Sequence, residues 1–421
     1  MARFFYNLAL LLLLPYVGLH LFLRSRRQPE YLRHVGERFG FYPSPQPSPR
    51  GGEGVIWLHA VSVGETRAAQ PLVTALKARY PGHRILLTHM TPTGRQASEE
   101  LFGDGVRRAY LPYDYPLAVK RFLAHFRPAV GIIMETELWP NLVRACKEQG
   151  IPLLLANARL SEKSARRYAR FPNLTRRALR DLAGIAAQTE QDAARLRALG
   201  APAVDVLGNV KFDILPPPEQ LALGEGLRRR IGPRPVLLAA STREGEETLL
   251  FEALAKRLPG EALLVVVPRH PQRFDEVAAL AVNAGFVVQR RSGDAQIAPQ
   301  TQVLLGDSMG EMFAYYAACD VAFVGGSLLE YGSQNLIEAC AAGRPVIIGR
   351  STYNFAQAAG EALACGAARQ VGSAEELMEA AATLLRDEAA RGRMGQAGKA
   401  FAARHRGATE RTLALISRAM R

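Results

Sequence analysis

Carboxylates stand directly after two apolar runs in the N-terminal half of the chain. Glu65 follows the loop Ser62–Gly64, and Glu135 and Glu137 follow the apolar run Ala129–Met134. At such a place a carboxylate can act as the general base that takes a proton from an acceptor hydroxyl. It can also simply complement the N-terminus of the next helix. A carboxylate pair without a basic neighbour is costly to bury, so we expect one of Glu135 and Glu137 to cap a helix and the other to orient an acceptor or stabilise developing charge.

A lysine stands at the end of the same half of the chain. Lys211 lies in the segment Gly208–Asp213, directly before a proline-rich stretch. Beside a departing phosphate, an ammonium group would stabilise the negative charge that builds up in the transition state. The alternative is an ordinary exposed surface lysine.

Polar or glycine-rich loops follow successive apolar runs in the C-terminal half. They are Pro268–Pro271, Gly306–Glu311, Gly325–Ser327 and Gly332–Asn335. Glycine-rich turns at helix N-termini offer free backbone N–H groups that bind phosphate, and Glu338, one turn into the next helix, has a carboxylate suited to ribose hydroxyls. One such loop is a weak signal, but three after successive strands favour a nucleotide site.

Metal-ligand and disulfide patterns are missing from the sequence. It contains no HxxxH or HExxH motif, no clustered Cys/His set and no Asp-x-Asp pair at a strand end. We therefore expect catalysis without a metal ion, in which Lys211 and Arg269 stabilise the leaving group. The cysteines fit neither a CxxC pair nor a disulfide framework, so we expect free thiols in a reducing compartment: Cys146, Cys319, Cys340 and Cys365.

Short apolar runs alternate with longer amphipathic stretches from Val55 onward, which predicts parallel sheets with covered faces. Strands are expected in the first half at Val55–Val61, Arg84–His89, Ala129–Met134, Pro152–Asn157 and Gly184–Gln188. Helices are expected between them, for example at Glu65–Tyr80 and Leu138–Gln149. The pattern restarts in the second half at Val236–Ala240, Ala262–Val267, Thr301–Leu305, Val321–Val324 and Pro345–Ile348.

A chain of 421 residues is too long for one compact core, so two domains are expected. Prolines at 216–218 and in Gly232–Pro235 interrupt the pattern, because proline continues neither a helix nor a central strand. We assign residues 55–214 to an N-terminal Rossmann-like domain, 215–234 to an interdomain linker and 235–421 to a C-terminal Rossmann-like domain. The last helix is a candidate to pack back on the first domain. Residues 28–54 are expected to form a shorter linker.

The first 27 residues have the composition of a membrane anchor. The run Phe4–Leu23 is uncharged, and Arg24, Arg26 and Arg27 follow it. A helix needs about 20 apolar residues to cross a bilayer, and the arginines would keep the following chain in the cytoplasm. We therefore predict a spanning anchor and a lipid acceptor. An interfacial helix, a signal peptide and a buried helix are the alternatives.

The net charge of +14 limits the classes of partner. A basic protein can bind nucleic acid, an anionic membrane surface or a phosphorylated substrate. No nucleic-acid-binding signature is present, so nucleic acid is the weakest of the three. A solvated helix face or a site for a phosphorylated acceptor would explain the run Arg159, Lys163, Arg166, Arg167, Arg170, Arg176, Arg177 and Arg180.

Eight segments resemble the motifs of one protein family. They are Gly36–Tyr42, Leu58–Glu65, Met134–Asn141, Ala156–Ser161, Ser241–Glu247, Val267–Pro271, Gly306–Glu311 and Phe323–Ser327. No single segment is specific, but together they are. The chain resembles the 3-deoxy-D-manno-octulosonic acid (Kdo) transferases of Gram-negative bacteria, and the resemblance extends over about residues 5–420.

The resemblance implies an α/β fold of the GT-B type, with two Rossmann-like domains facing a cleft and an N-terminal membrane-anchor helix. It also implies an inverting, metal-independent glycosyltransferase without a cofactor. Such an enzyme moves Kdo from CMP-Kdo to the lipid A precursor lipid IVA during lipopolysaccharide core synthesis. It works on the cytoplasmic side of the cell inner membrane, with the bilayer as a partner and no nucleic acid.

The resemblance also implies roles for single residues. Glu65 matches the family's general base, and Glu135 and Lys211 match its transition-state stabilisers. Its CMP-Kdo-binding segments match Pro268, Arg269, Met309, Gly310, Glu311, Asn335, Leu336, Ile337 and Glu338. Ser333 and Gln334 stand where many members have glycine and histidine, a departure that bears on donor fine-tuning rather than donor class.

Other functions remain as alternatives. A GT-B glycosyltransferase with another nucleotide sugar and another membrane lipid is the nearest of them. Sugar-nucleotide 2-epimerases share the fold, but a membrane anchor argues against a soluble epimerase. A non-catalytic membrane scaffold would not require carboxylates at strand ends.

Overall fold

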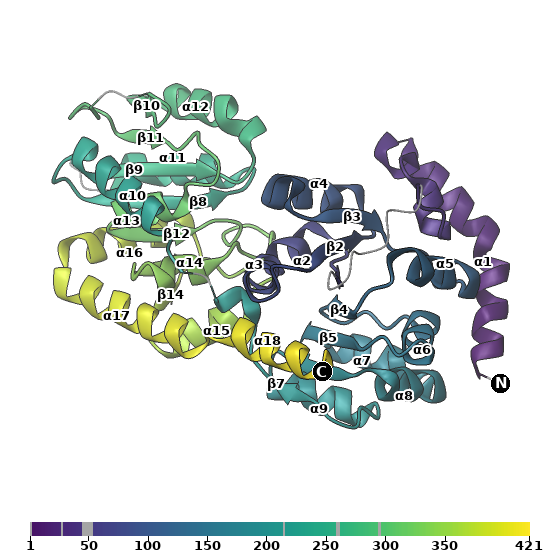
Figure 1. Ribbon diagram of the computed structural model, residues 1–421. Helices are drawn as coiled ribbons and strands as arrows, with labels where there is room; N and C mark the ends of the chain where they lie inside the picture. Colours follow the sequence, from purple (N-terminus) through teal and green to yellow (C-terminus); the bar gives the residue numbers. More distant parts are fainter. Residues whose placement is uncertain (1, 27, 44–53, 214, 258–261, 294–295) are drawn as a thin grey trace. The chain divides into compact units, whose positions relative to one another are not determined.

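The structure is a computed structural model that describes residues 2–26, 28–43, 54–213, 215–257, 262–293 and 296–421. The chain divides into two compact units, one formed by residues 1–213 and 406–421 and the other by residues 214–405. Each unit contains a seven-stranded sheet (Figure 1), and every strand pairing is parallel. The predicted α/β class is therefore confirmed.

The sheet of the first unit has the strand order β3-β2-β1-β4-β5-β6-β7. The strands are β1 Val55–His59, β2 Arg84–His89, β3 Arg107–Tyr110, β4 Val130–Met134, β5 Leu153–Ala158, β6 Gly184–Ala187 and β7 Asp205–Val206. The helices are α1 Ala2–Ser25, α2 Val63–Ala68, α3 Gln70–Arg79, α4 Pro92–Phe102, α5 Pro116–Phe126, α6 Pro140–Glu148, α7 Glu162–Ala169, α8 Pro172–Asp181, α9 Glu190–Ala198 and α18 Ala408–Ala419. Short 3-10 helices complete the unit: η1 Pro29–Leu32, η2 Val35–Phe39, η3 Gly103–Gly105 and η4 Val210–Phe212.

The sheet of the second unit has the order β10-β11-β9-β8-β12-β13-β14. The strands are β8 Val236–Thr242, β9 Leu263–Pro268, β10 Val288–Arg290, β11 Val303–Leu305, β12 Val321–Val324, β13 Val346–Ile348 and β14 Ala368–Gln370. The helices are α10 Pro218–Ile231, α11 Glu246–Arg257, α12 Phe274–Asn283, α13 Met312–Ala318, α14 Leu336–Ala341, α15 Ala356–Ala364, α16 Ala374–Arg386 and α17 Glu388–Arg404, with the 3-10 helix η5 Pro271–Arg273.

Buried side chains pack on both faces of the central strands. In the first unit, Phe122 and Leu142 belong to one hydrophobic cluster, and Ile56, Leu72 and Ile416 belong to another. Successive residues of a strand point to opposite faces, so these nearly uninterrupted apolar strands feed both clusters. Helices accordingly cover both faces of each sheet, which is typical of parallel sheets.

Several segments differ from the sequence-based expectations. The single helix expected over Glu65–Tyr80 is two helices, α2 and α3, which meet at Ala69 just before Pro71. The predicted linker 215–234 contains α10, which belongs to the second unit, because proline is well tolerated in the first turn of a helix. The last helix, α18, belongs to the first unit, where Tyr80 hydrogen-bonds Ser417 over 2.7 Å.

The shorter predicted linker, residues 28–54, also has structure where it is described. Residues 28–43 contain η1 and η2, and the side chains of Glu37 and Arg38 are buried. The Glu37 carboxylate accepts a hydrogen bond from the backbone N–H of Tyr110 over 2.7 Å and pairs with Arg95 over 3.1 Å. The segment is therefore part of the first unit rather than a spacer, while residues 44–53 lie outside the described residues.

Candidate active site

In each unit the strand order reverses between two neighbouring central strands, β1 and β4 in the first unit and β8 and β12 in the second. Ligands of open α/β sheets bind beyond the carboxyl ends of the strands at such a switch point. The predicted carboxylates Glu65 and Glu135 follow β1 and β4. The loops Thr242–Glu246 and Gly325–Ser327 follow β8 and β12. The topology therefore puts a candidate site in each unit, at the carboxyl ends of the central strands of its sheet.

Glu65 lies in the first turn of α2 and bends back toward the end of β1. Its Oε2 accepts a hydrogen bond from the backbone N–H of Val61 over 2.7 Å, and its Oε1 accepts one from the Ser62 hydroxyl over 3.1 Å. The pKa of Glu65 is raised to about 7, chiefly by burial and also by the negative charges of Glu135 and Glu137, while the two hydrogen-bond donors oppose the rise. A carboxylate with a near-neutral pKa is well matched to proton transfer at physiological pH.

Glu135 and Lys211 form an ion pair beside Glu65. The distance between Lys211 Nζ and Glu135 Oε1 is 3.7 Å, and both side chains are about a quarter exposed, at 26% and 27%. Glu135 has a left-handed backbone with φ of 57°, which is unfavourable for any residue other than glycine. Backbone strain of this kind tends to persist at functional sites.

Asn157 fixes the segment that carries Lys211. The Asn157 side-chain oxygen accepts a hydrogen bond from Val210 N over 3.1 Å, and the Asn209 side chain caps η4 by accepting one from Lys211 N over 3.0 Å. Asn157 is buried and has φ of 54°. The sequence analysis did not single out Asn157 as a site residue, although it lies in a motif that carried the family resemblance.

Glu137 is the second carboxylate of the loop after β4. Burial raises its pKa, and the charge of Glu135 raises it further. The first N–H groups of α6, those of Asn141 and Leu142, donate to the Asp114 carboxylate and not to Glu135 or Glu137. The expectation that one of the pair caps this helix is therefore wrong. The carboxylates instead share one site with Glu65.

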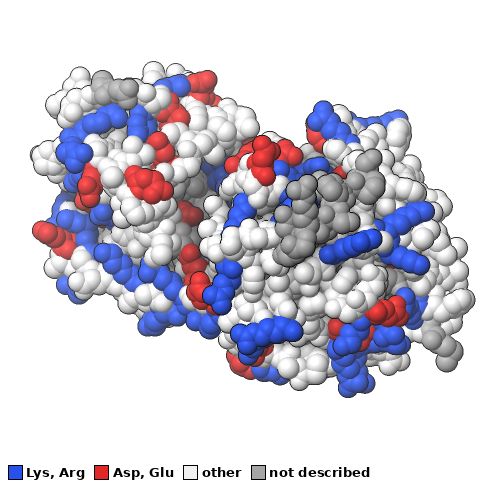
Figure 2. Space-filling model, viewed as in Figure 1, with Lys and Arg blue, Asp and Glu red and all other residues white. Residues whose placement is uncertain are grey.

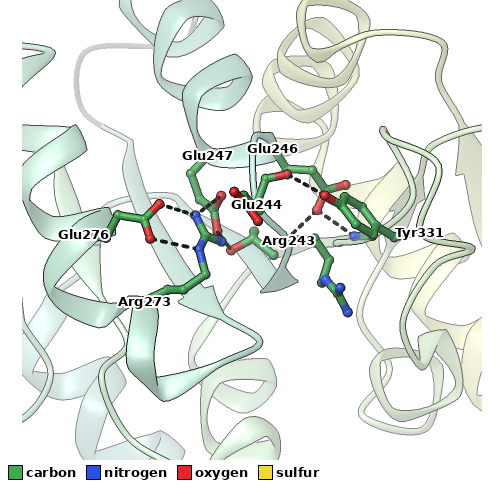
Figure 3. A network of polar contacts seen from close by, with 9 residues as sticks. Arg243, Glu244, Glu246, Glu247, Arg273, Glu276 and Tyr331 are labelled. Carbon is green, nitrogen blue, oxygen red and sulfur yellow. Dashed lines mark hydrogen bonds and ion pairs between the residues drawn. The ribbon is translucent and has the colours of Figure 1, made fainter. Parts of the chain in front are cut away.

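Glu246 organises the switch point of the second unit (Figure 3). Its buried carboxylate accepts hydrogen bonds from four backbone N–H groups, at 2.6–3.0 Å. The donors are Arg243, Gly326, Ser327 and Leu328. One side chain thus holds the loop after β8 and the loop after β12 in a fixed geometry. Burial raises the pKa of Glu246 while the backbone donors oppose that rise.

The next residue, Glu247, forms a separate network in Figure 3. Its fully buried carboxylate makes a bidentate pair with Arg273, at 2.8 and 3.1 Å, and accepts a hydrogen bond from the Thr242 hydroxyl over 2.7 Å. Arg273 also contacts Glu276. Bidentate pairs of arginine and carboxylate are among the strong hydrogen bonds of proteins, so this network ties the end of β8 to the start of α12.

Glycine is required where the two loops meet. A Cβ atom on Gly325 would lie 2.6 Å from the backbone oxygen of Ser241. Ser241 itself has φ of 56°, and the Arg243 guanidinium lies over the Tyr331 ring at 4.5 Å from its centroid. The backbone of β12 therefore approaches that of β8 too closely for any side chain at residue 325.

The predicted donor-binding residues lie in three loops or loop ends of the second unit. Pro268 ends β9, and Arg269 N donates to Thr242 O over 3.0 Å. The Glu311 carboxylate accepts from Ser308 over 2.6 Å and lies 3.5 Å from Arg291, while Met309 is 55% exposed. Gly310 precedes Glu311 with φ of 78°.

The third of these segments begins α14. Asn335 caps the helix by accepting from Ile337 N over 3.0 Å, and its side-chain N–H donates to Glu338 over 3.0 Å. The side chains of Leu336 and Ile337 are fully buried in the core. The predicted contact of these two residues with CMP-Kdo is thus limited to their backbone atoms.

Ser333 has a backbone that glycine would adopt more easily. Its φ is 68°, and its N–H donates to Gly326 O over 2.6 Å. The following residue, Gln334, donates from its N–H to Gly325 O over 2.9 Å. The departure from the family pattern at residue 333 therefore falls on a left-handed turn that is tied to the Gly325–Ser327 loop.

Among the residues that the structure describes, no group of three or more His, Cys, Asp or Glu side chains could hold a metal ion. Glu246 is, besides Asn157, a site residue that the sequence analysis missed. It lies in the motif Ser241–Glu247, which was noted for the resemblance but not connected to Gly325–Ser327, about 80 residues away in the chain.

Two family models match the chain. Residues 33–214 match the model described as 3-deoxy-D-manno-octulosonic-acid transferase (kdotransferase), and residues 279–401 match glycosyl transferases group 1. The chain is 46% identical to the 3-deoxy-D-manno-octulosonic acid transferase of Bordetella pertussis, over 98% of each chain. It is 39% identical to the protein of the same name from Haemophilus influenzae, over 99% of this chain and 98% of the other.

Solved structures with low sequence identity share the fold. A glycosyltransferase from Rickettsia africae aligns with 88% of this chain and 99% of its own at 14% identity, with a TM-score of 0.56. UDP-GlcNAc 2-epimerase from Neisseria meningitidis aligns with 87% of this chain and 100% of its own at 16% identity, with a TM-score of 0.57. The fold is thus GT-B-like, as the resemblance implied.

Proposed function

Because the chain belongs to the 3-deoxy-D-manno-octulosonic acid (Kdo) transferase family and is a glycosyltransferase, we propose that it transfers Kdo from CMP-Kdo to lipid IVA. The proposed reaction inverts the anomeric carbon, uses no metal ion and has Glu65 as its general base. It takes place on the cytoplasmic side of the inner membrane. One observation carries the proposal: a carboxylate with a pKa of about 7 lies at the switch point of the first unit, beside the pair of Glu135 and Lys211.

The proposed step is a direct displacement. Glu65 takes the proton of the acceptor hydroxyl, and the hydroxyl oxygen forms a bond to the anomeric carbon of Kdo. The bond between that carbon and the CMP phosphate oxygen breaks, and its electron pair stays on the phosphate. Inversion follows, because the hydroxyl attacks opposite the leaving group.

The partners of Glu65 suit this role. Val61 N–H and the Ser62 hydroxyl orient the carboxylate, while burial and the neighbouring carboxylates keep its proton affinity high enough to act as a base near neutral pH. Lys211, held by Glu135, supplies positive charge at the same sheet edge. Preorganised positive charge stabilises a leaving phosphate more than mobile solvent does.

The proposed donor site is the loop cluster of the second unit. Glu246 already accepts four backbone hydrogen bonds there, so it supports the loops rather than binding an anion itself. Arg269, at the end of β9, is the proposed contact for the CMP phosphate. The proposal requires the two units to present their sites to one pair of substrates.

Product mass analysis tests the donor, the acceptor and the number of transfers together. The purified enzyme would be given lipid IVA with CMP-Kdo generated in place, in parallel with UDP-sugars. In a further arm EDTA would be added, together with the enzyme, only after CMP-Kdo has formed, because its formation from CTP itself uses a divalent cation. We expect a mass increase of whole Kdo units only with CMP-Kdo, undiminished by EDTA. Transfer from a UDP-sugar would overturn the donor assignment, and loss of transfer in EDTA would overturn metal independence.

A further inference from the structure

One face of helix α1 lies against the first unit near both ends of the helix, over residues 3–10 and again over residues 17–25, while residues 11–16 are exposed. Within each of these stretches the less exposed residues have the spacing of a single helix face. These residues are Arg3, Tyr6, Asn7, Leu10, Val17, His20, Leu21 and Ser25. Leu21 and Ser25 are buried, at 5% and 8% exposure. The helix is therefore seated on the unit rather than projecting from it.

Asn141 fastens the N-terminal end of this face. Arg3 Nε donates to Asn141 Oδ1 over 3.0 Å, and Asn141 Nδ2 donates to Asn7 Oδ1 over 2.7 Å. Asn141 is itself fixed, because its backbone N–H donates to Asp114 over 2.9 Å and its side chain donates to Asp114 O over 2.6 Å. The polar residues of α1 are thus bonded to the start of α6, at the carboxyl end of the sheet.

Two tyrosines extend the attachment. The Tyr6 hydroxyl donates to the buried carboxylate of Asp114 over 2.9 Å. From the unit side, the Tyr115 hydroxyl donates to the backbone oxygen of Leu10 over 3.0 Å. Tyr6 and Asn7, two polar side chains in the first two turns of α1, therefore both have partners in the first unit.

The remaining circumference of α1 is apolar and exposed. Its exposed side chains have exposures of 40–74%. They are Phe4, Phe5, Leu8, Leu11, Leu12, Leu13, Leu14, Tyr16, Leu19, Phe22 and Leu23. In Figure 2 the edge of the surface where Figure 1 shows α1 is largely white. A continuous apolar surface of this extent marks a protein or membrane contact.

Basic residues lie at both ends of α1. Arg24 and Arg26 are exposed at its C-terminal end. At its N-terminal end, a hollow between α1, α6 and α8 is lined by Arg3, Arg144 and Arg177 and also by Asp181. Arg3 pairs with Glu148, and Arg144 pairs with Glu148 and Asp181, so the positive charge at this end comes chiefly from Arg177 and from Arg176 and Arg180, which are exposed on α8. A spanning helix with a cytoplasmic C-terminus needs arginines on one side only. A helix lying along an anionic headgroup layer is attracted to it at both ends.

We infer that α1 lies in the plane of the membrane, embedded in one leaflet, with both of its ends on the side of the two units. A helix of 24 residues is about 36 Å long, enough to span, but spanning would draw the attached unit into the hydrocarbon. The attachment points Asp114, Asn141 and Tyr115 belong to a unit whose neighbouring helix α8 exposes Arg176, Arg177 and Arg180, and charged groups are excluded from the bilayer core. The inference rests on the proposed membrane location but not on the proposed reaction.

Cysteine labelling tests the inference in sealed proteoliposomes of phosphatidylethanolamine and phosphatidylglycerol. Ala2→Cys and Gln28→Cys report the two ends of the helix, in the full-length chain with Cys365→Ser, because the other native thiols are buried. Ala389→Cys, on α17, reports the side on which the second unit lies. A membrane-impermeant maleimide is expected to label all three positions from the same side and to the same extent. Loss of label at residue 2 until the vesicles are opened would establish a spanning helix and overturn the inference.

Depth measurements add an independent test that does not depend on activity. Fluorophores on Phe5→Cys, Leu12→Cys and Leu19→Cys, all on exposed positions two turns apart, would be quenched by lipids brominated at different acyl positions. An in-plane helix gives the same shallow depth for all three. A deepest position at residue 12 would show a transverse helix, and no quenching at any position would show that no membrane covers this face. Since no readout involves transfer of Kdo, failure of the proposed reaction leaves both tests valid.

Discussion

Glu65 and Glu246 occupy equivalent positions in the two sheets but have opposite surroundings. Each follows the strand that lies at the switch point of its unit. Glu246 is fully buried and accepts four backbone hydrogen bonds, whereas Glu65 is partly exposed and accepts two. A carboxylate that already accepts four hydrogen bonds holds the backbone segments that donate them. A carboxylate that accepts only two still has lone pairs that can bind a proton. The same residue type thus supports structure in the second unit, while in the first unit we propose that it takes part in the chemistry.

The largest expected effect is on the rate of transfer in Glu65→Gln. Glutamine keeps the size of the side chain, its oxygen can still accept from Val61 N–H, and its NH2 group can donate to the Ser62 hydroxyl instead of accepting from it. It does not act as a base, so we expect kcat to fall by about 10²- to 10⁴-fold. CMP binding measured by calorimetry should stay unchanged. Glu100→Gln, on the exposed side of α4, is the matched control. Transfer at the wild-type rate by Glu65→Gln would remove this residue from the mechanism.

A second effect of similar importance is expected in Glu246→Ala, but on stability and donor binding. Three loop N–H groups at residues 326–328 would lose their acceptor, and each buried unsatisfied group costs about 1–3 kcal/mol. We expect a lower free energy of unfolding in urea and a loss of CMP binding by calorimetry. Glu252→Ala, an exposed position of the same helix, provides the comparison. Intact CMP binding in Glu246→Ala would mean that the donor loops hold their shape without it.

The pH dependence of kcat/KM should report the raised pKa of Glu65. Because the pKa of Glu65 is raised to about 7, kcat/KM should rise with pH through about 7 as the base loses its proton.

The linked effect of the Glu65 pKa on the free energy of unfolding has the opposite sign. A carboxyl with a raised folded-state pKa contributes stability below its unfolded pKa and loses it as the pH rises through 7. Glu65→Gln should therefore show a smaller decline of stability between pH 5 and 8, measured by urea unfolding at each pH; an unchanged decline would contradict the raised pKa.

The smallest expected effect is that of Ser333→Gly. Glycine would relieve the left-handed backbone at this position but would also increase the entropy of the unfolded chain. These terms oppose each other, so we expect the free energy of unfolding to change by less than about 1 kcal/mol. The KM for CMP-Kdo is the more sensitive readout, because residue 333 is tied to the Gly325–Ser327 loop. A large change in kcat with constant KM would place its role elsewhere.

The fold could be predicted from sequence as far as its buried strands allowed. The central strands are nearly continuous apolar runs, and all ten predicted strands correspond to observed ones within a few residues. The missed strands β3, β7, β10 and β14 lie at or next to sheet edges. They are two to four residues long and carry polar or charged side chains such as Arg107, Asp205 and Arg369, so they lack an apolar signal. Local sequence patterns therefore predict the buried central strands but not the short, polar edge strands.

The residues of the candidate site could be predicted from the sequence, but the contacts between segments far apart in the chain could not. Glu65, Glu135 and Lys211 could be singled out because each follows a strand or ends a domain, and the structure brings them together. Their roles in catalysis stay predictions. The bonds from Glu246 to residues 326–328 span about 80 residues of chain, a separation that no local spacing encodes. The left-handed backbones of Glu135 and Asn157 were equally invisible, because nothing in either residue type requires them.

The return of the C-terminal segment to the first unit has a consequence for how the protein folds during its synthesis. Asp213 accepts hydrogen bonds from the backbone of Gly407 and Thr409, and Leu413 and Ile416 complete a hydrophobic cluster with β1 and α3. The ribosome synthesises these residues after the entire second unit. Because domains generally fold as they emerge, the hydrophobic cluster of the first unit stays incomplete until residues 406–421 have emerged. Removal of residues 406–421 would therefore damage the unit whose synthesis begins first.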